Sequence, residues 1–405
     1  MAPPVRPILP CLGATEPKRS PPVLSNDLLR EIFLRTASPA DLARASVACV
    51  SFLRLITDPS FLRRYRSLHP PLLLGFLGLD GIDPVRAPHP NAPAARALAR
   101  AADFSMSYLP RDGALRDVRD GRILLELMDE EYEEGRFLWD LAVCDPLTRR
   151  CLLLPPIPDD LLASVGVQKH NVVNVDVFLV PSGYVEETPF KAIHCTIGQK
   201  SLVVFVFSSG SGCWSVGAST SWDALSLDEP QNSDVLGLCH YVYGCFFWKV
   251  IHRDKVLKLD MEEMEFSTYA LPPDHIERTV VIVEAGEGKL AMFSRIPEGT
   301  SLDYYTFSQS GRDKAGEWHM KNTIPLPAHY ECHIARQAEG HIFLLGIPKV
   351  RNGARPVCFS LEIKTFNIER VNGVRKPGFV FPYFGFPPFL SPRRIRGYKV
   401  FQFQD

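Results

Sequence analysis

Three adjacent histidine–cysteine pairs are the residues of this sequence best suited by type to bind a metal ion. They are His194-Cys195, Cys239-His240 and Cys332-His333. A zinc site needs three or four such ligands that converge on one point. Neighbouring residues of a β-strand point to opposite faces, so the two members of a pair do not easily share one ion. We therefore expect no metal site.

Two glycine-containing segments have part of the composition of a catalytic or nucleotide-binding loop. Ser208–Gly212 lacks the G-x-S-x-G pattern of a nucleophile elbow and has the composition of a turn. Gly286-Glu287-Gly288 is half of a phosphate-loop pattern, but it opens a strand rather than a helix, which argues against dinucleotide binding. We expect no catalytic residue and no cofactor.

The composition excludes several classes of partner. Lys and Arg total 45 against 46 Asp and Glu, a net charge of −1, so no electrostatic footprint for nucleic acid or a membrane is present. No apolar run reaches transmembrane length, and the proline-rich residues 1–22 predict a disordered lead rather than a signal peptide. The ten cysteines show no metal spacing, and we expect buried, reduced thiols.

Residues 23–66 carry the start signals of several short amphipathic helices. Ser25 is suited to cap a first helix, whose apolar stripe includes Leu28 and Ile32. Ser38-Pro39 predicts a second start, because proline loses nothing at the first helical position. Asp58-Pro59 predicts a further start. Taken from periodicity alone, these helices are equally well explained as packing units of a larger domain.

The chain from about residue 70 is β-rich and repetitive. The segments 141–156, 256–273 and 357–371 each contain an apolar strand that ends in an acid, a polar turn and a second strand. More degenerate copies lie at 203–216 and 303–320, so the turns follow one another at intervals of 64, 51, 51 and 51 residues. Glycine followed by an apolar strand precedes several copies. About four strands per unit is the size of a propeller blade. The repeats predict five blades, and strands at 72–79, near 104–109 and at the C-terminus predict a sixth that draws on both ends.

The N-terminal segment resembles a known family. The order L-x-x-D-L-L-x-E-I, S-P-x-D-L and V-A-C-x-x-F-x-x-L-I-x-D-P-S-F, over about 45 residues, resembles an F-box. Three positions depart from the family pattern. Ser25 stands where an F-box usually has proline, Val50 where it has a basic residue, and Phe52 where it has tryptophan.

The rest of the chain resembles the F-box-associated β-propeller repeats of large plant F-box families. The motifs are V-C-D-P-L-T-R-R-C-L-L-L-P-P, L-x-L-D-x-x-x-M-E-F-S and C-F-S-L-E-I-K-T-F, scattered over 72–390. The resemblances imply a disordered lead at 1–22, an F-box at 23–68 and a β-propeller of about six four-stranded blades at 69–405. The expected fold class is α+β multidomain.

These resemblances imply a non-catalytic, substrate-recognition subunit of a cullin–RING ubiquitin ligase of the SCF type. The F-box would bind a Skp-type adaptor, and through it a cullin scaffold, and the propeller would bind an unknown protein substrate, in the cytoplasm, the nucleus or both. The expected adaptor-binding side chains are apolar: Leu24, Leu28, Leu29, Ile32, Phe33, Leu42, Val47, Cys49, Phe52, Leu55 and Ile56. The sequence does not separate those that face the adaptor from those that hold the helices together.

Two other functions remain open at this point. One is an interaction scaffold whose F-box no longer engages a ligase, because of the three departures. The other is a propeller enzyme or small-ligand binder with an incidental helical start.

Overall fold

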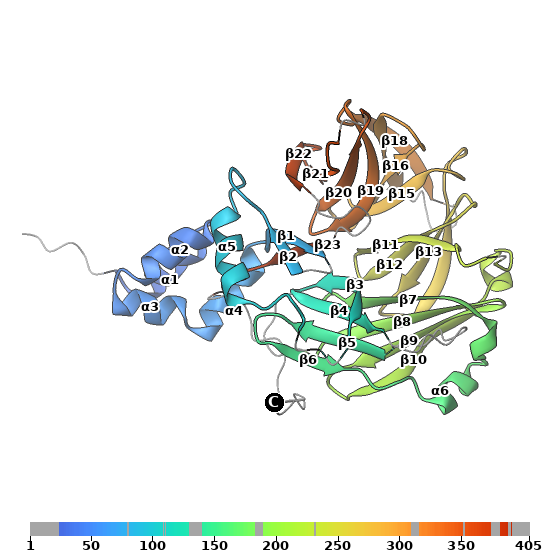
Figure 1. Cartoon of the computed structure of the whole chain (residues 1–405), viewed down its shortest axis with the longest axis horizontal. Coiled ribbons are helices and arrows are strands. Elements are labelled where there is room, and N and C mark those ends of the chain that lie inside the picture. Colours follow the sequence, from blue (N-terminus) through green and yellow to red (C-terminus); the bar gives the residue numbers. More distant parts are fainter. Residues whose placement is uncertain are drawn as a thin grey trace, which may run out of the picture. The chain divides into compact units, whose positions relative to one another are not determined.

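The computed structural model describes residues 24–78, 81–107, 109, 111–128, 140–182, 189–230, 232–308, 316–350, 353–373, 381–387 and 390 of the 405-residue chain. The expected lead at 1–22 and the expected strand at 398–404 lie outside these residues. The chain divides into two compact units, residues 1–61 and residues 62–405. Figure 1 shows the N-terminal helices in blue and the strands from light blue to red.

The first unit contains short helices, and each helix start follows its sequence signal. The helices are α1 (Asn26–Leu34), α2 (Pro39–Ser46), α3 (Val50–Ile56) and the beginning of α4 (Pro59–Leu68). The Ser25 hydroxyl accepts the Leu28 N–H at 3.3 Å, and the Ser38 hydroxyl accepts the N–H of Asp41 at 3.3 Å. These bonds satisfy backbone donors that have no partner within the helix. The predicted helix starts are confirmed.

The described strands of the second unit form six antiparallel sheets, which we number as blades 1 to 6 (Figure 1). Blade 1 joins β2 (Gly81–Pro84), β1 (Leu72–Gly78) and β23 (Phe381–Gly385). Blade 2 joins β3 (Gly113–Arg119), β4 (Arg122–Leu127), β5 (Asp140–Asp145) and β6 (Arg150–Leu153). Blade 3 joins β7 (Val172–Val180), β8 (Lys191–Gly198), β9 (Ser201–Ser208) and β10 (Cys213–Ser221).

The remaining sheets follow in chain order. Blade 4 joins β11 (Leu236–Val242), β12 (Cys245–Val250), β13 (Lys255–Asp260) and β14 (Glu265–Ala270). Blade 5 joins β15 (Thr279–Glu284), β16 (Leu290–Arg295), β17 (Ser301–Ser308) and β18 (Glu317–Pro325). Blade 6 joins β19 (Tyr330–Ala338), β20 (His341–Pro348), β21 (Val357–Glu362) and β22 (Ile368–Gly373). The short helices α5 (Ala92–Ala101), α6 (Asp159–Ser164), η1 (Lys169–Asn171) and η2 (Asp223–Leu225) lie in connections.

The hairpin recognised in the sequence is the outer half of blades 2 to 6. Its five copies are the pairs β5–β6, β9–β10, β13–β14, β17–β18 and β21–β22. In two copies the acid accepts hydrogen bonds from the backbone of its own turn. An Asp145 oxygen accepts the Leu147 N–H at 3.0 Å. An Asp260 oxygen accepts the N–H of Glu262 at 3.0 Å and that of Glu263 at 3.2 Å. The spacing recurs because this turn geometry recurs.

The glycine that precedes an apolar strand in the sequence lies in the turn between the first two strands of a blade. At Asp120-Gly121 the φ angles are 50° and 69°, and at Glu339-Gly340 they are 46° and 77°. Positive φ at both central residues of a two-residue hairpin is typical of a type I′ turn, which matches the twist of the strands. The second repeated element is therefore a turn signal as well.

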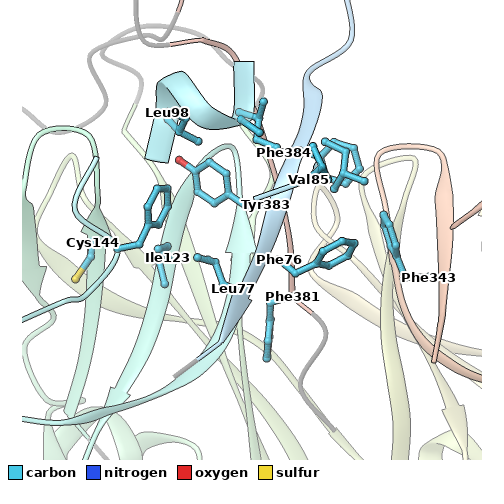
Figure 2. Close-up of a cluster of buried hydrophobic side chains, with 14 of the residues drawn as sticks. Phe76, Leu77, Val85, Leu98, Ile123, Cys144, Phe343, Phe381, Tyr383 and Phe384 are labelled. Carbon is cyan, nitrogen blue, oxygen red and sulfur yellow. The ribbon is translucent and has the colours of Figure 1, made fainter. Parts of the chain in front are cut away.

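Buried apolar clusters lie between neighbouring blades and close the ring. Separate clusters join blades 2 and 3, 3 and 4, 4 and 5, and 5 and 6. A further cluster contains residues from blades 6, 1 and 2. In this cluster the ring of Phe76 lies 5.6 Å from that of Phe343, and Phe104 lies 5.1 Å from Tyr383. Figure 2 shows the cluster. The six-bladed propeller is confirmed.

Blade 1, which is the predicted sixth blade built from both ends of the chain, differs from its prediction in one element. As predicted, it draws on both ends of the chain, because β1 pairs with β23. The expected strand near 104–109 is absent from the described part of that segment, where Phe104 packs as a buried ring in the cluster. An aromatic residue that fills a core between blades produces the same apolar signal as a short strand.

The prediction of buried, reduced cysteines is wrong at four positions. The register of β5 and β6 places Cys144 opposite Cys151, and the two form a disulfide. Cys49 and Cys213 are exposed. A spacing of seven residues does not match a metal motif, but it fits two directly opposed positions of a hairpin. In the part of the chain that the structure describes, no helix is long and apolar enough to cross a membrane.

Candidate functional site

The helical unit divides the eleven predicted adaptor-binding residues into two groups. Four are buried and hold the helices together: Phe33, Leu42, Leu55 and Ile56. Five are exposed: Leu24, Leu28, Ile32, Val47 and Cys49. Leu29 and Phe52 are partly exposed. Burial thus distinguishes the residues that pack the helices together from those that remain at the surface of the helical unit.

The exposed side chains of the first helix lie on one face. Leu28 and Ile32 are 49% and 45% exposed and lie four residues apart on α1, so they share one face of the helix. Leu24, two residues before the helix, is 43% exposed. We call these three residues the α1 face. Leu34 is buried on the other side of the same helix. A helix of this kind presents apolar surface in two directions.

A second exposed group lies around the turn between α2 and α3. Val47 ends α2 and is 81% exposed, and Val50 and Leu53 of α3 are 63% and 44% exposed. We call these residues the α2–α3 face. Sequence reasoning did not assign Val50 and Leu53 to the site. The available signal was their position, because Leu53 lies three residues after Val50 on a helix whose other face carries Leu55 and Ile56.

The propeller contains a central channel with a cavity of about 640 Å³. Strands from five blades line it, chiefly β3, β7, β11 and β19, with Phe381 of β23. Apolar side chains such as Phe178, Leu236 and Phe381 form much of the wall, and a few polar side chains interrupt it: Arg116, Asp176, Cys239, His333, Arg336 and Gln337. This volume and this mixture are typical of a ligand pocket.

Asp117 is the centre of a buried polar network beside the channel. One of its oxygens accepts the Leu179 N–H at 3.0 Å and Arg119 Nε at 3.0 Å, and the other accepts Arg336 Nη1 at 3.3 Å. These partners come from blades 2, 3 and 6. The Arg336 guanidinium also lies 4.0 Å above the Phe381 ring of blade 1. The network fixes the channel walls relative to one another.

Burial shifts the pKa values of several groups that border the channel. Burial raises the pKa of Asp176 to about 6, and the positive charge of Arg116 opposes this shift. Burial also raises the pKa of Cys239 well above its usual value. Burial, followed by the charges of Arg119 and Arg336, lowers the pKa of His240 to about 3. His240 is therefore neutral and Cys239 remains a thiol at neutral pH.

The residues first considered for metal chemistry lie on three different strands. His194-Cys195 is on β8, Cys239-His240 on β11 and Cys332-His333 on β19. Within the described ranges, no group of three or more His, Cys, Asp and Glu side chains is arranged to hold a metal ion. Ser208–Gly212 forms the turn between β9 and β10, and Gly286–Gly288 forms the turn before β16.

The network and Asp176 were missed in the sequence, although each left a signal. The segment that becomes β3 contains Arg116, Asp117 and Arg119 and then Asp120, an unusual charge density for an inner strand. Asp176 interrupts the otherwise apolar run VDVFLV. Charged residues within apolar strands are rarely buried without a partner or a function.

Comparison with known proteins identifies no family for this chain. No family model and no curated protein matches the chain. Solved structures that match include an acylaminoacyl peptidase of Pyrococcus horikoshii, with 9% identity, TM-score 0.37, and alignment over 64% of this chain and 39% of that one. The β-propeller domain of the Trilobed protease from Pyrococcus furiosus matches with 10% identity and TM-score 0.35, over 65% and 70%. The aligned part of this chain thus spans well under half of the first of these proteins.

Proposed function

We propose that this chain is the substrate-recognition subunit of a cullin–RING ubiquitin ligase of the SCF type. In this proposal the helical unit docks on a Skp-type adaptor and the propeller holds a protein substrate. The observation that carries the proposal is the pair of exposed apolar faces on the short helices, taken together with the F-box resemblance of the same residues. The chain would contribute no catalytic residue and need no cofactor.

The exposed faces have the character of a docking surface. Six apolar side chains between Leu24 and Leu53 are between 43% and 81% exposed. Soluble proteins rarely leave apolar side chains gathered in this way unless a partner covers them. Burying a leucine or isoleucine side chain contributes about 1.5–3 kcal/mol, so several of them support a stable complex.

The three departures from the F-box pattern have physical explanations that are compatible with docking. Ser25 replaces the usual proline and caps α1 through its hydroxyl. Phe52 packs edge-to-face against Phe33, with ring centroids 5.0 Å apart, so its ring supports the helices from within. Val50 is 63% exposed and adds apolar area where the family usually carries a charge.

The function follows from proximity rather than from chemistry on this chain. A substrate held by the propeller would stand near a ubiquitin-charged enzyme that the cullin scaffold recruits. Tethering converts the transfer to a substrate lysine into a step at high effective concentration. A receptor of this kind works in the cytoplasm or the nucleus, where the ligase is present.

The test is capture of a purified Skp-type adaptor by the full-length chain. We expect Leu28→Asp together with Ile32→Asp to weaken capture at least about 100-fold, because two charges would enter the apolar interface. The matched control is Val350→Asp, since Val350 is a 70% exposed apolar residue of the propeller. This variant should bind like the wild type.

Two results would count against the proposal. Equal capture by the double variant and the wild type would show that the α1 face does not dock on the adaptor. No capture by a wild-type chain with an intact thermal transition would instead favour the second function, an interaction scaffold outside the ligase. The far-UV circular dichroism of each variant shows whether the helices still fold.

A further inference from the structure

The channel contains polar atoms that the described protein does not satisfy. Asp176 lines the cavity and makes no hydrogen bond or ion pair with any residue that the structure describes. Arg336 and Gln337 also line the cavity, and their buried Nε and Oε1 atoms have no hydrogen-bond partner among the described residues. Buried polar atoms without partners cost free energy, so these two atoms and the unpaired Asp176 carboxyl at one cavity indicate a ligand that supplies their partners.

The other charged side chains near the cavity already have partners of the opposite sign. Arg116 pairs with Glu126, and Asp117 binds both Arg119 and Arg336. Asp176 is therefore the acid left without a counter-charge. Arg116 is the charged residue that most influences it, and that guanidinium is engaged by Glu126.

The unsatisfied atoms define what a ligand must offer. The Asp176 carboxylate and Gln337 Oε1 are hydrogen-bond acceptors and require donors. The donor to Asp176 is preferably positively charged, because the carboxylate is an anion. Arg336 Nε is a donor and requires an acceptor. A peptide segment with one basic residue provides all three: a cationic side chain, a main-chain N–H and a main-chain carbonyl.

We propose that the central channel binds a peptide segment of the protein substrate through an arginine or lysine side chain, whose cationic end pairs with Asp176. The main chain of the segment then reaches Gln337 and Arg336. The apolar wall, which includes Phe178 and Leu236, contacts the methylene groups of the basic side chain. This inference rests on the proposed function, because it names the class of substrate that the propeller recognises.

Binding of a basic residue in the channel restricts which substrate residue can accept ubiquitin. A lysine held on Asp176 is enclosed in the channel and cannot reach a ubiquitin thioester. The recognised residue and the residue that accepts ubiquitin must therefore be different positions of the substrate. The propeller recognises one basic residue and leaves the remaining lysines of the substrate accessible.

The experiment selects random seven-residue peptides displayed on phage against the immobilised full-length chain. We expect enrichment of peptides with a central arginine or lysine. A selected peptide, remade with a fluorophore, should bind Asp176→Asn at least about tenfold more weakly than the wild type. Replacing its basic residue by citrulline or norleucine should weaken binding by a similar factor.

Two variants serve as controls. Asp160→Asn removes an exposed acid of α6 and should leave peptide binding unchanged. Asp176→Glu keeps the charge and should retain part of the affinity, which separates loss of charge from loss of structure.

The inference is overturned if the selected peptides show no basic preference, if they bind Asp176→Asn as well as the wild type, or if acidic peptides are enriched instead. Adaptor capture is measured on the same variants. Capture retained by Asp176→Asn together with a failed peptide result rejects the channel inference alone, whereas loss of capture by the wild type rejects the proposed function.

Discussion

The helical unit and the propeller distribute apolar side chains in opposite ways. Six large apolar residues are exposed within residues 24–61, against ten within the described part of residues 62–405, which is about eight times as long. The propeller instead places polar groups inside, at Asp117, Asp176 and Arg336. An exposed apolar surface favours a lasting partner, and a polar channel favours a partner chosen by charge and hydrogen bonds.

The sharpest test of this difference compares one apolar side chain from each region. Phe293 of β16 is fully buried between blades 5 and 6, and its change to alanine should lower the free energy of unfolding by about 3–5 kcal/mol. Leu28→Ala should change it by less than about 0.5 kcal/mol, because Leu28 is already 49% exposed. Urea denaturation of both variants measures the values. A cost above about 2 kcal/mol for Leu28→Ala would contradict the assignment of the α1 face to an interface.

The second test concerns the charges that the propeller buries. Asp117→Asn should lower the free energy of unfolding by about 3 kcal/mol, because two guanidiniums lose the carboxylate that they share. The control is Asp228→Asn, which breaks the exposed ion pair with Arg253 and should cost less than about 1 kcal/mol. If the two variants have equal thermal midpoints, the channel network does not hold the blades together.

Much of the propeller was predictable because each blade repeats the same local physics. The acids Asp145 and Asp260 bind backbone N–H groups of their own turns, and such contacts leave a signal at fixed spacing. The channel was not predictable in this way. Asp117 and Arg336 are separated by 219 residues and come from the inner strands, where the blades differ from one another. No local pattern indicates that two such residues meet.

The helical unit shows a different limit. Its helix starts were readable from Ser25 and Ser38, because capping is local. The division between Leu28, which is exposed, and Leu42, which is buried, was not readable. Both roles require apolar side chains at helical spacing, and only the packing of α1, α2 and α3 decides which side chains remain outside.

The third test uses pH to compare the channel with the rest of the propeller. The folded state raises the pKa of Asp176 from 3.8 to about 6, so ionisation of this carboxyl opposes folding. The titratable groups that face it are Arg116 of β3 and the thiols Cys195 of β8 and Cys239 of β11. The penalty is absent below about pH 3, where the carboxyl is protonated in both states, develops as the pH rises from about 4 to 6, and is complete above about pH 7.

Asp176→Asn removes this penalty. The variant should therefore be more stable than the wild type by about 3 kcal/mol at pH 7.5, and the difference should vanish below about pH 3. Thermal unfolding of both proteins across this pH range gives the comparison. A variant that is more stable and yet binds peptides less well is typical of a residue kept for binding. Equal stability at every pH would show that Asp176 is already compensated.

The smallest expected effect concerns the departure at Ser25. Its φ angle is −65°, the value that a proline ring imposes, so Ser25→Pro fits the backbone of the α1 start. The variant loses the bond from the Leu28 N–H, which costs about 0.5–1 kcal/mol, and it gains about as much from a more restricted unfolded chain. The free energy of unfolding should therefore stay within about 0.5 kcal/mol of the wild type.

Ser25→Ala loses the cap without the compensation and should be less stable by about 1 kcal/mol. Because neither change touches the exposed side chains of the α1 face, both variants should capture the adaptor like the wild type. Tighter capture by Ser25→Pro would mean that serine at this position had weakened docking, and that the α1 start itself belongs to the interface.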